Sequence, residues 1–461
     1  MKRIGGWAAI LVLANVVADV VVGSPMMVIP QLLDRFDTDE AAWLTASALL
    51  SGAIWSPVLA KAADVHGTRR VLIGALTVAS AGALACVVAP SVWFFVVGRL
   101  LQGAGFAAVF LTVALVVQIC RPHEAMVLVG LVTSSSSLVG IVEPLLMTPI
   151  IDRSGDRGVF AVAGMLAIAA AAGVAVCIPE SQVRSPGRVD AVGALLLGGG
   201  LAGVLGYLSL GSDVGWRSPQ MCALLGIGVI ALAGCLFRCL HIEDPIIDLR
   251  SLTRPVLLTL AALVLAGGAF RCMLHLFGVV GRVPATAGLG YGLGGAAAAL
   301  FAAANLGIAL GGITAGWLAR RLGAAATLVG GIIVGTAAAF AMIAGDSVVP
   351  VALACATALG AAAGAIGASG YTLAVSSAAP DRQGTVAGLV SVVMALGSVL
   401  VTIVGAEILE AARMPDAIVS GAPVSTATGV HVYVATAGAL FALAVVPAIV
   451  LARGHRTAAM T

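Results

Sequence analysis

The sequence predicts an all-α polytopic membrane protein, and composition, segment length and charge placement carry that prediction. Of the 461 residues, 61% are hydrophobic and 10% are charged, and the mean hydropathy is +1.12. Soluble domains carry about 25% charged residues, so most of this chain has too few polar side chains to face water. The formal net charge of +3 is too small to indicate a nucleic-acid partner.

Fourteen apolar segments are each long enough to cross a bilayer, which takes about 20 residues. In chain order they are 7–33, 41–60, 71–90, 91–118, 125–150, 158–178, 191–210, 220–237, 255–281, 288–319, 322–345, 348–379, 384–410 and 430–452. The first segment follows Lys2 and Arg3 and has no cleavage site, so we interpret it as a span and not as a signal peptide.

Charge placement predicts how these spans are oriented. With the N-terminus inside, most of the 24 Lys and Arg residues lie on the cytoplasmic side, in keeping with the positive-inside rule. The only lysines are Lys2 and Lys61, which is typical of a GC-rich bacterial genome. We therefore expect a multi-pass protein of the bacterial cytoplasmic membrane with both termini in the cytoplasm.

A repeat relates two loops of the chain. The segment AKAADVHGTRR follows the second predicted span and GWLARRLGAAA follows the tenth. When Asp64 is aligned with Arg320, Gly67 falls opposite Gly323. Basic residues after a helix also arise from the positive-inside rule alone, but the shared glycine favours a true repeat. Internal repeats of this kind are typical of secondary transporters, whose substrate site lies at the repeat interface.

The repeat predicts the domain organisation. We expect an N-terminal six-helix bundle over 1–178, two inserted transmembrane helices with cytoplasmic linkers over 179–254, and a C-terminal six-helix bundle over 255–461. The 58 glycines fit helices that pack closely in lipid, where small residues let backbones approach. The eight cysteines are scattered, and Cys235 and Cys239, one helical turn apart, are interpreted as apolar filler. We expect no metal site.

Several ionisable residues lie inside the predicted spans, among them Asp19, Arg99, Glu143, Arg271 and Glu407. A charge at mid-bilayer costs about 2.5–3.5 kcal/mol on insertion scales, so each must face the bundle interior, a wet cavity or a partner. Arg99 lies about 12 Å and Glu143 about 10 Å from the outer ends of their spans, at 1.5 Å per residue. The hypothesis is that Arg99 pairs with Glu143 or Asp19 and that one of the two acids carries the coupling proton. A purely structural ion pair is the alternative.

A second set of polar residues is assigned to a substrate cavity: Gln102, Arg271, His275 and Asn305. His275 follows Arg271 by four residues and therefore shares its helical face. The alternative for His275 is an ordinary hydrogen-bonded side chain. The alternative for Asn305 is an interhelical hydrogen bond.

Two ordered motifs make the chain resemble the Major Facilitator Superfamily, specifically its fourteen-span drug:proton antiporter branch. The family's loop motif G-x-L-x-D-R-x-G-R-R is matched by Asp64, Gly67, Arg69 and Arg70. Its fourth-span motif R-x-x-Q-G-x-G-x-A is matched by Arg99, Gln102, Gly103, Gly105 and Ala107. Segments 243–252 and 382–397 are also similar to this branch.

The resemblance implies two six-helix bundles and proton-coupled export of lipophilic or amphipathic small molecules by alternating access. It implies that the loop of Asp64, Gly67, Arg69 and Arg70 holds the inner gate closed. The expected energy source is the proton gradient, with no cofactor, and the expected state is a monomer among membrane lipids. One departure stands out: the fifth-span Gly-Pro-x-x-Gly-Gly element of the antiporters reads EPLLMT here, keeping only Pro144.

Two alternatives remain open at this point. The same fold could export lipids or another endogenous metabolite, because an aromatic content of 5% suits an aliphatic cavity for either cargo. A polytopic enzyme or sensor is the other. An enzyme would need an aqueous segment with clustered His, Asp or Cys residues, and every loop here is short. We therefore expect a transporter and not an enzyme.

Overall fold

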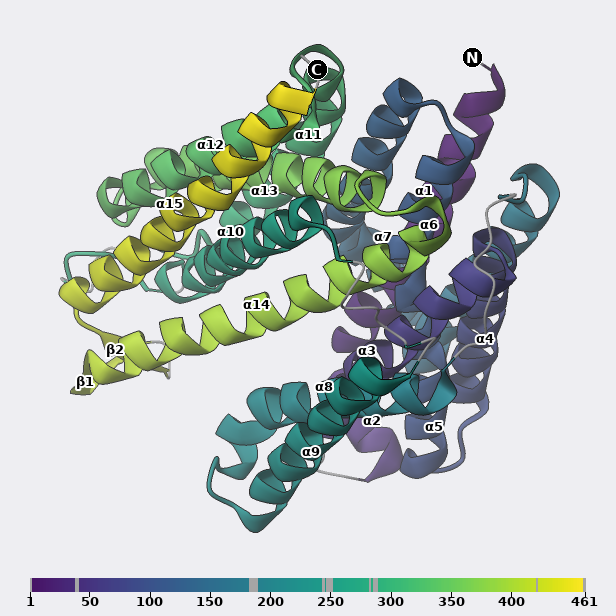
Figure 1. Cartoon of the computed structure of the whole chain (residues 1–461). Coiled ribbons are helices and arrows are strands. Elements are labelled where there is room, and N and C mark those ends of the chain that lie inside the picture. Colours follow the sequence, from purple (N-terminus) through teal and green to yellow (C-terminus); the bar gives the residue numbers. More distant parts are fainter. Residues whose placement is uncertain are drawn as a thin grey trace. The chain divides into compact units, whose positions relative to one another are not determined.

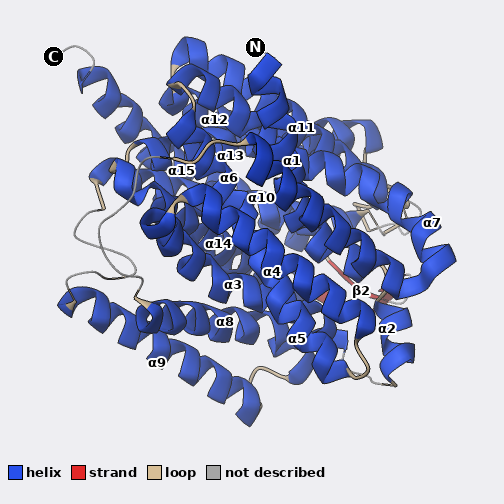
Figure 2. Cartoon of the chain, turned by 90° about the vertical axis from the view of Figure 1, so that its right-hand side faces the viewer, coloured by secondary structure: helices blue, strands red, loops and turns tan. Residues whose placement is uncertain are grey.

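The computed structural model describes residues 2–37, 41–181, 190–242, 245, 252–281, 283–284, 289–419 and 422–458. Helices make up nearly all of this part of the chain (Figure 2). The chain divides into two compact units. Unit 1 comprises Met1–Ala125, Val139–Thr253 and Val375–Val392, and unit 2 comprises Met126–Leu138, Arg254–Ala374 and Val393–Thr461. An all-α fold, as the sequence predicts, is confirmed. The predicted domain boundaries stay a prediction.

Unit 1 is built from the helices of the first half of the chain (Figure 1). These are α1 (Lys2–Met26), α2 (Ile29–Phe36), α3 (Ala41–His66), α4 (Thr68–Val88), α5 (Val92–Gln102), α6 (Ala107–Ile119), most of α7 (Pro122–Cys177), α8 (Ala191–Val214) and α9 (Pro219–His241). The first residues of α14 (Gln383–Ala411) also belong to unit 1.

Unit 2 holds α10 (Arg254–Val280), α11 (Ala297–Leu322), α12 (Ala324–Gly345), α13 (Val349–Ser376), the rest of α14, and α15 (Ala427–Ala458). Between α14 and α15, strands β1 (Arg413–Val419) and β2 (Ala422–Ser425) pair as an antiparallel hairpin. The sequence predicts only a loop over 411–429, so the structure differs from the prediction in forming a hairpin there. Its ladder gives this connection backbone partners, and Ser425 Oγ donates a further bond, of 2.9 Å, to the Leu409 carbonyl at the end of α14.

Each of the fourteen predicted spans overlaps a helix of the structure. Nine helices in the described ranges are long and apolar enough to cross a membrane: Thr68–Val88, Val92–Ile119, Leu146–Cys177, Pro219–His241, Arg254–Val280, Ala297–Leu322, Ala324–Gly345, Val349–Ser376 and Ala427–Arg453. Shorter apolar stretches lie at Gly6–Val21, Val127–Glu143 and Ala191–Tyr207. The chain is thus a multi-pass membrane protein, and the count of fourteen stays a prediction.

Two predicted spans are interrupted in the structure, and two others are joined in one helix. The first divides into α1 and α2 near Pro25 and Pro30, which lack the backbone N–H that a continuous helix needs. The fourth tightens into a 3₁₀ turn over Gly103–Phe106, between α5 and α6. The fifth and sixth are joined in α7, whose backbone breaks at Gly155 with φ 59° and ψ −153°. An L side chain rarely adopts that conformation, so glycine allows the break.

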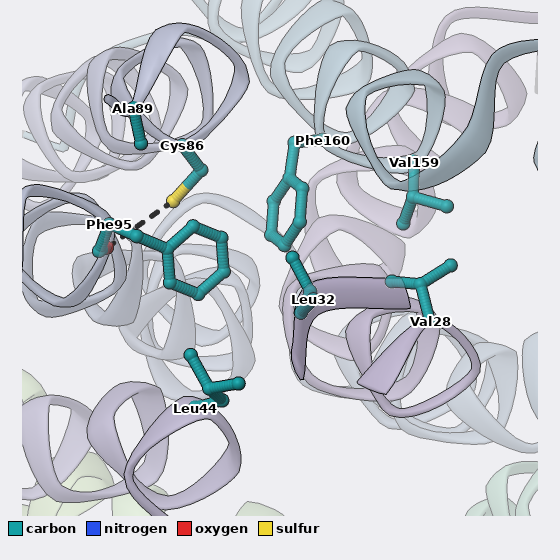
Figure 3. Packing of buried hydrophobic residues seen from close by; sticks show 8 residues of the cluster. All are labelled: Val28, Leu32, Leu44, Cys86, Ala89, Phe95, Val159 and Phe160. Carbon is teal, nitrogen blue, oxygen red and sulfur yellow. Dashed lines mark hydrogen bonds between the residues drawn. The ribbon is translucent and has the colours of Figure 1, made fainter. Parts of the chain in front are cut away.

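An aromatic and aliphatic cluster packs α2, α3, α4, α5 and α7 together in unit 1. Its buried members are Val28, Leu32, Leu44, Cys86, Ala89, Phe95, Val159 and Phe160 (Figure 3). The rings of Phe95 and Phe160 meet edge to face, with centroids 5.2 Å apart, an arrangement favoured by the ring quadrupoles. The cluster therefore lies one turn from Arg99 on α5 and gives that residue an apolar neighbour.

Small residues let helices approach closely in both units. A Cβ atom at Gly203 of α8 would lie 2.8 Å from the Gly228 Cα of α9, and at Gly198 it would lie 2.5 Å from the Ile54 Cα of α3. In unit 2 the glycines of α11 and α13 face each other's backbones in the same way. This packing agrees with the expectation from composition, because backbone proximity is what holds helices together in lipid.

Candidate functional site

Asp64, a residue of the predicted gating loop, makes a polar contact between two helices of unit 1. Its carboxylate lies in the last turn of α3 and is 4% exposed. It accepts hydrogen bonds from the backbone N–H of Gly384 (2.7 Å), the N–H of Thr385 (2.8 Å) and the Thr385 hydroxyl (2.5 Å). These donors form the N-terminus of α14, where free N–H groups and the helix dipole favour an anion. We call this contact the Asp64 clasp.

The residue type at 384 is what lets the carboxylate reach the helix end. A Cβ atom at Gly384 would lie 2.6 Å from Asp64 Oδ1 and 3.0 Å from the Ala60 carbonyl oxygen. Any larger side chain would therefore displace Asp64. Gly388, one turn further along α14, packs in the same way against Ala60.

The clasp changes the acidity of Asp64, which lies beyond the predicted span 41–60. Burial raises the pKa of Asp64 to about 6, against the opposing effects of the hydrogen bonds from Thr385 and Gly384 and of the nearby Lys61 charge. Because an exposed aspartate has a pKa of about 3.9, the clasped carboxyl binds a proton more tightly than a hydrated one.

The other loop residues of the predicted gate fasten α4 to the end of α7. Gly67 joins α3 to α4 with φ 100° and ψ 132°. Arg69 donates to the carbonyl oxygens of Val174 (3.3 Å) and Ala175 in the last turn of α7. Its backbone N–H donates to Glu180 (3.1 Å), and Arg70 lies 3.6 Å from the same carboxylate. Arg69 and Arg70 therefore hold helices together through these contacts, in addition to any effect of their charge on membrane orientation.

Arg99 lies in α5 and is buried, with 1% of its surface exposed. Its guanidinium donates to the Val21 carbonyl of α1 (2.7 Å) and to Gln102 Oε1 (2.7 Å). The Phe160 ring centroid lies 5.8 Å from the Arg99 Cζ atom. In the part of the chain that the structure describes, Arg99 Nε and Gln102 Nε2 have no hydrogen-bond partner. The motif residues Arg99 and Gln102 thus bind each other, and Arg99 also binds α1.

The two acids proposed to pair with Arg99 also lie in unit 1. Glu143 is buried in α7, and Asp19 is partly buried in α1. Both engage in interactions of their own. The direct bonds of Arg99 run to a carbonyl and an amide oxygen, so its pairing with either acid stays a prediction.

The residues assigned to a substrate cavity fall in both units. Gln102 is buried in unit 1. Arg271 and His275 lie one turn apart on α10 with exposed side chains, and Asn305 on α11 donates to the Phe301 carbonyl (3.0 Å). The last contact lies within α11, so the interhelical hydrogen bond given as the alternative for Asn305 also stays a prediction. A shared cavity for these four residues stays a prediction.

Sequence reasoning missed three partners that complete these contacts: Thr385 at the clasp, Glu180 at the gating loop and Phe160 beside Arg99. Of these three residues, only Thr385 could have been suspected from the sequence, because it lies in segment 382–397, which is similar to the antiporter branch. Segment 243–252, the other such stretch, lies almost entirely outside the described residues.

Curated relatives of this chain include transporters linked to drug resistance. It is 28% identical over 251 residues to the "Multidrug resistance protein B homolog" of Mycobacterium tuberculosis, covering 53% of this chain and 46% of that protein. It is 27% identical over 235 residues to the "Uncharacterized MFS-type transporter YcnB" of Bacillus subtilis, covering 49% and 48%. The "Lincomycin resistance protein LmrB" of Listeria monocytogenes is 26% identical over 237 residues, covering 50% of each chain. The matches span about half the length of these relatives.

Solved structures share the fold over nearly the whole chain. The human organic anion transporter MFSD10 (TETRAN) superposes with a TM-score of 0.62 at 16% identity, covering 97% of this chain and 99% of that one. The proton:xylose symporter XylE gives a TM-score of 0.62 at 14% identity, covering 96% and 94%. Residues 11–402 match the profile of the Major Facilitator Superfamily. The chain therefore belongs to the Major Facilitator Superfamily, whose members are transporters and not enzymes.

Proposed function

We propose that this transporter is a proton-coupled exporter of lipophilic or amphipathic small molecules that works by alternating access in a bacterial cytoplasmic membrane. The Asp64 clasp is the observation that carries the proposal. It joins the end of α3 to the start of α14, residues 320 positions apart in sequence. Drug resistance in the names of several relatives supports the substrate class.

The clasp has the chemistry of a gate that opens and closes. Three donors converge on one buried carboxylate, and hydrogen bonds to a charged group each contribute about 1.5–3 kcal/mol. Opening breaks them but returns the carboxylate to water, which offsets much of that loss. A contact of this kind has two well-separated states with a modest free-energy difference, as alternating access requires.

Transport by everted membrane vesicles tests the proposal. A panel of lipophilic cations, amphipathic antibiotics and fluorescent phospholipids is supplied with and without a proton gradient. Gradient-dependent accumulation of small molecules is expected. Accumulation of the phospholipids alone would instead identify a lipid exporter, and accumulation that ignores the gradient would contradict proton coupling.

Two variants examine the clasp itself. Asp64→Asn removes the charged acceptor, and Gly384→Ala displaces an intact Asp64 by steric contact. Both should reduce accumulation at least tenfold while membrane insertion stays near normal, since about 1.4 kcal/mol lost from one gating state changes its population tenfold.

Asp381→Asn is the matched control for the clasp variants, because Asp381 is a partly exposed residue three positions from Gly384. It should transport like the unmodified protein. Unchanged transport by both clasp variants would leave Asp64 as a residue of topology only.

A further inference from the structure

The loop of unit 2 that repeats the gating loop of unit 1 has the same backbone. Gly323 joins α11 to α12 with φ 86° and ψ 154°, close to the angles of Gly67. Each glycine donates its N–H to the carbonyl four residues earlier, Ala63 or Ala319, and each accepts from the residue four positions later. The two turns are therefore structural equivalents, but their arginines occupy different positions: Arg69 and Arg70 follow Gly67, whereas Arg320 and Arg321 precede Gly323.

The arginines of the two turns have different surroundings. In unit 1, Glu180 supplies a carboxylate to Arg70 and to the start of α4, and a Cβ atom at Gly67 would lie 2.9 Å from Glu180 Oε1. In unit 2, a Cβ atom at Gly323 would have nothing within 4 Å. Arg320 and Arg321 are exposed, and no carboxylate of the described residues lies within ion-pair distance of either. Arg320 and Arg321 thus present two positive charges with no carboxylate partner among the described residues, whereas Arg70 of unit 1 has Glu180.

These arginines end an exposed apolar stripe of α11. Its members recur at helical spacing and about half of each side chain is exposed: Leu306, Leu310, Ile313 and Trp317. Arg321 continues the same face, and its guanidinium lies 4.1 Å from the centroid of the Trp317 ring. Tryptophan is enriched where hydrocarbon meets headgroups, so the stripe follows the acyl chains up to the interface at Trp317.

We propose that Arg320, Arg321 and Trp317 form a binding surface for an anionic phospholipid. The acyl chains lie along Leu310 and Ile313, and the headgroup phosphate binds between the two guanidinium groups. Guanidinium groups bind phosphate with paired hydrogen bonds, and a basic side chain near the membrane surface is attracted to anionic lipids. A zwitterionic lipid offers the same chains but no net charge for these arginines to balance.

Tryptophan quenching tests this surface in the full-length protein reconstituted in phosphatidylcholine vesicles. Phosphatidylglycerol with brominated chains is added at increasing fractions, and the signal of Trp317 is isolated by subtracting the Trp317→Phe variant. We expect quenching of Trp317 at a lower fraction of brominated phosphatidylglycerol than of brominated phosphatidylcholine. Arg320→Gln with Arg321→Gln should raise the half-quenching fraction at least tenfold.

Matched variants separate a specific site from general charge. Arg321→Lys keeps the charge and should retain most of the binding, which also shows that substitution at this position leaves the fold intact. Arg413→Gln removes one exposed positive charge from the hairpin and should bind like the unmodified protein. Equal quenching by both lipids, or an equal loss in Arg413→Gln and Arg321→Gln, would overturn the proposal. Displacement of the lipid by inorganic phosphate would overturn it as well, by identifying a soluble anion as the ligand.

Discussion

At the scale of single residues, Arg99 explains how a permanent charge is tolerated in an apolar segment. Its donors reach the Val21 carbonyl and Gln102 Oε1, so part of its desolvation cost is offset by hydrogen bonds within the protein. Arginine stays protonated in proteins and cannot itself carry the coupling proton. In the proposed proton-coupled exporter the proton carrier is therefore another group, and the acids of the predicted spans are the candidates.

Glu143→Gln tests the buried acid of α7. We expect it to abolish accumulation of substrate against its gradient but to leave downhill exchange, because glutamine keeps the shape of glutamate and cannot release a proton at physiological pH. Both activities are measured in proteoliposomes with and without an imposed pH gradient. Glu407→Gln, at an exposed acid of α14, serves as the control. Full accumulation by Glu143→Gln would transfer the proposed coupling role to Asp19.

The pKa of Asp64 predicts how the clasp responds to pH. A pKa of about 6 in the closed clasp, against about 3.9 in water, means that the closed state binds the proton more tightly. The resulting stabilisation is complete below pH of about 4 and is lost as pH rises through about 6. Hydrogen exchange of the Gly384 and Thr385 amides, corrected for intrinsic rates, should therefore show more opening at pH 7.5 than at pH 5.5.

Asp64→Asn is the control for this pH response, because asparagine does not titrate in that range. Its amide exchange at Gly384 and Thr385 should be faster and independent of pH after correction. A pH-independent exchange rate in the unmodified protein would show that Asp64 does not titrate in the clasp.

At the scale of elements, the two repeated turns allow the effect of the same substitution on thermal stability to be compared at equivalent positions. Alanine at Gly67 or Gly323 must adopt a positive φ, which costs about 1–3 kcal/mol. At Gly67 the new Cβ would also lie 2.9 Å from Glu180 Oε1, whereas at Gly323 it would meet no described atom within 4 Å. Both variants should have a lower melting temperature than the unmodified protein in detergent. The decrease should be larger for Gly67→Ala than for Gly323→Ala. The reverse order would show that the Glu180 contact adds no steric cost.

At the scale of the whole molecule, the prediction to test is the number of spans. The two inserted helices, α8 and α9, each run about the length of a bilayer crossing and are joined by a short turn. A reporter fused within GSDVGWRSPQ should therefore lie outside the cell, and one within PESQVRSPGRVD should lie inside. Phosphatase and fluorescent-protein fusions at both sites measure this. Both reporters on the same side would refute the fourteen-span topology.

The sequence was sufficient for much of the helical layout. Apolar segments of bilayer length predict where helices form, because helices satisfy their own backbone hydrogen bonds in lipid. The spacing of Gly67 after Asp64, and of Gly323 after Arg320, predicts two equivalent turns, and both glycines have a positive φ. The hairpin over Arg413–Val419 and Ala422–Ser425 was not predictable from periodicity, because short strands without a clear alternation resemble a polar loop.

The sequence by itself determined that this chain is a helical membrane protein with the motif pattern of a known transporter family, because segment length, charge placement and motif spacing are local properties. Only the tertiary structure decided which groups those motif residues meet. Asp64 binds Gly384 and Thr385, and Arg99 binds the Val21 carbonyl, which a motif pattern does not specify. The physical reason is that such partners come from distant parts of the chain. Their approach depends on how small residues such as Gly384 let packed helices meet, and no local pattern records that geometry.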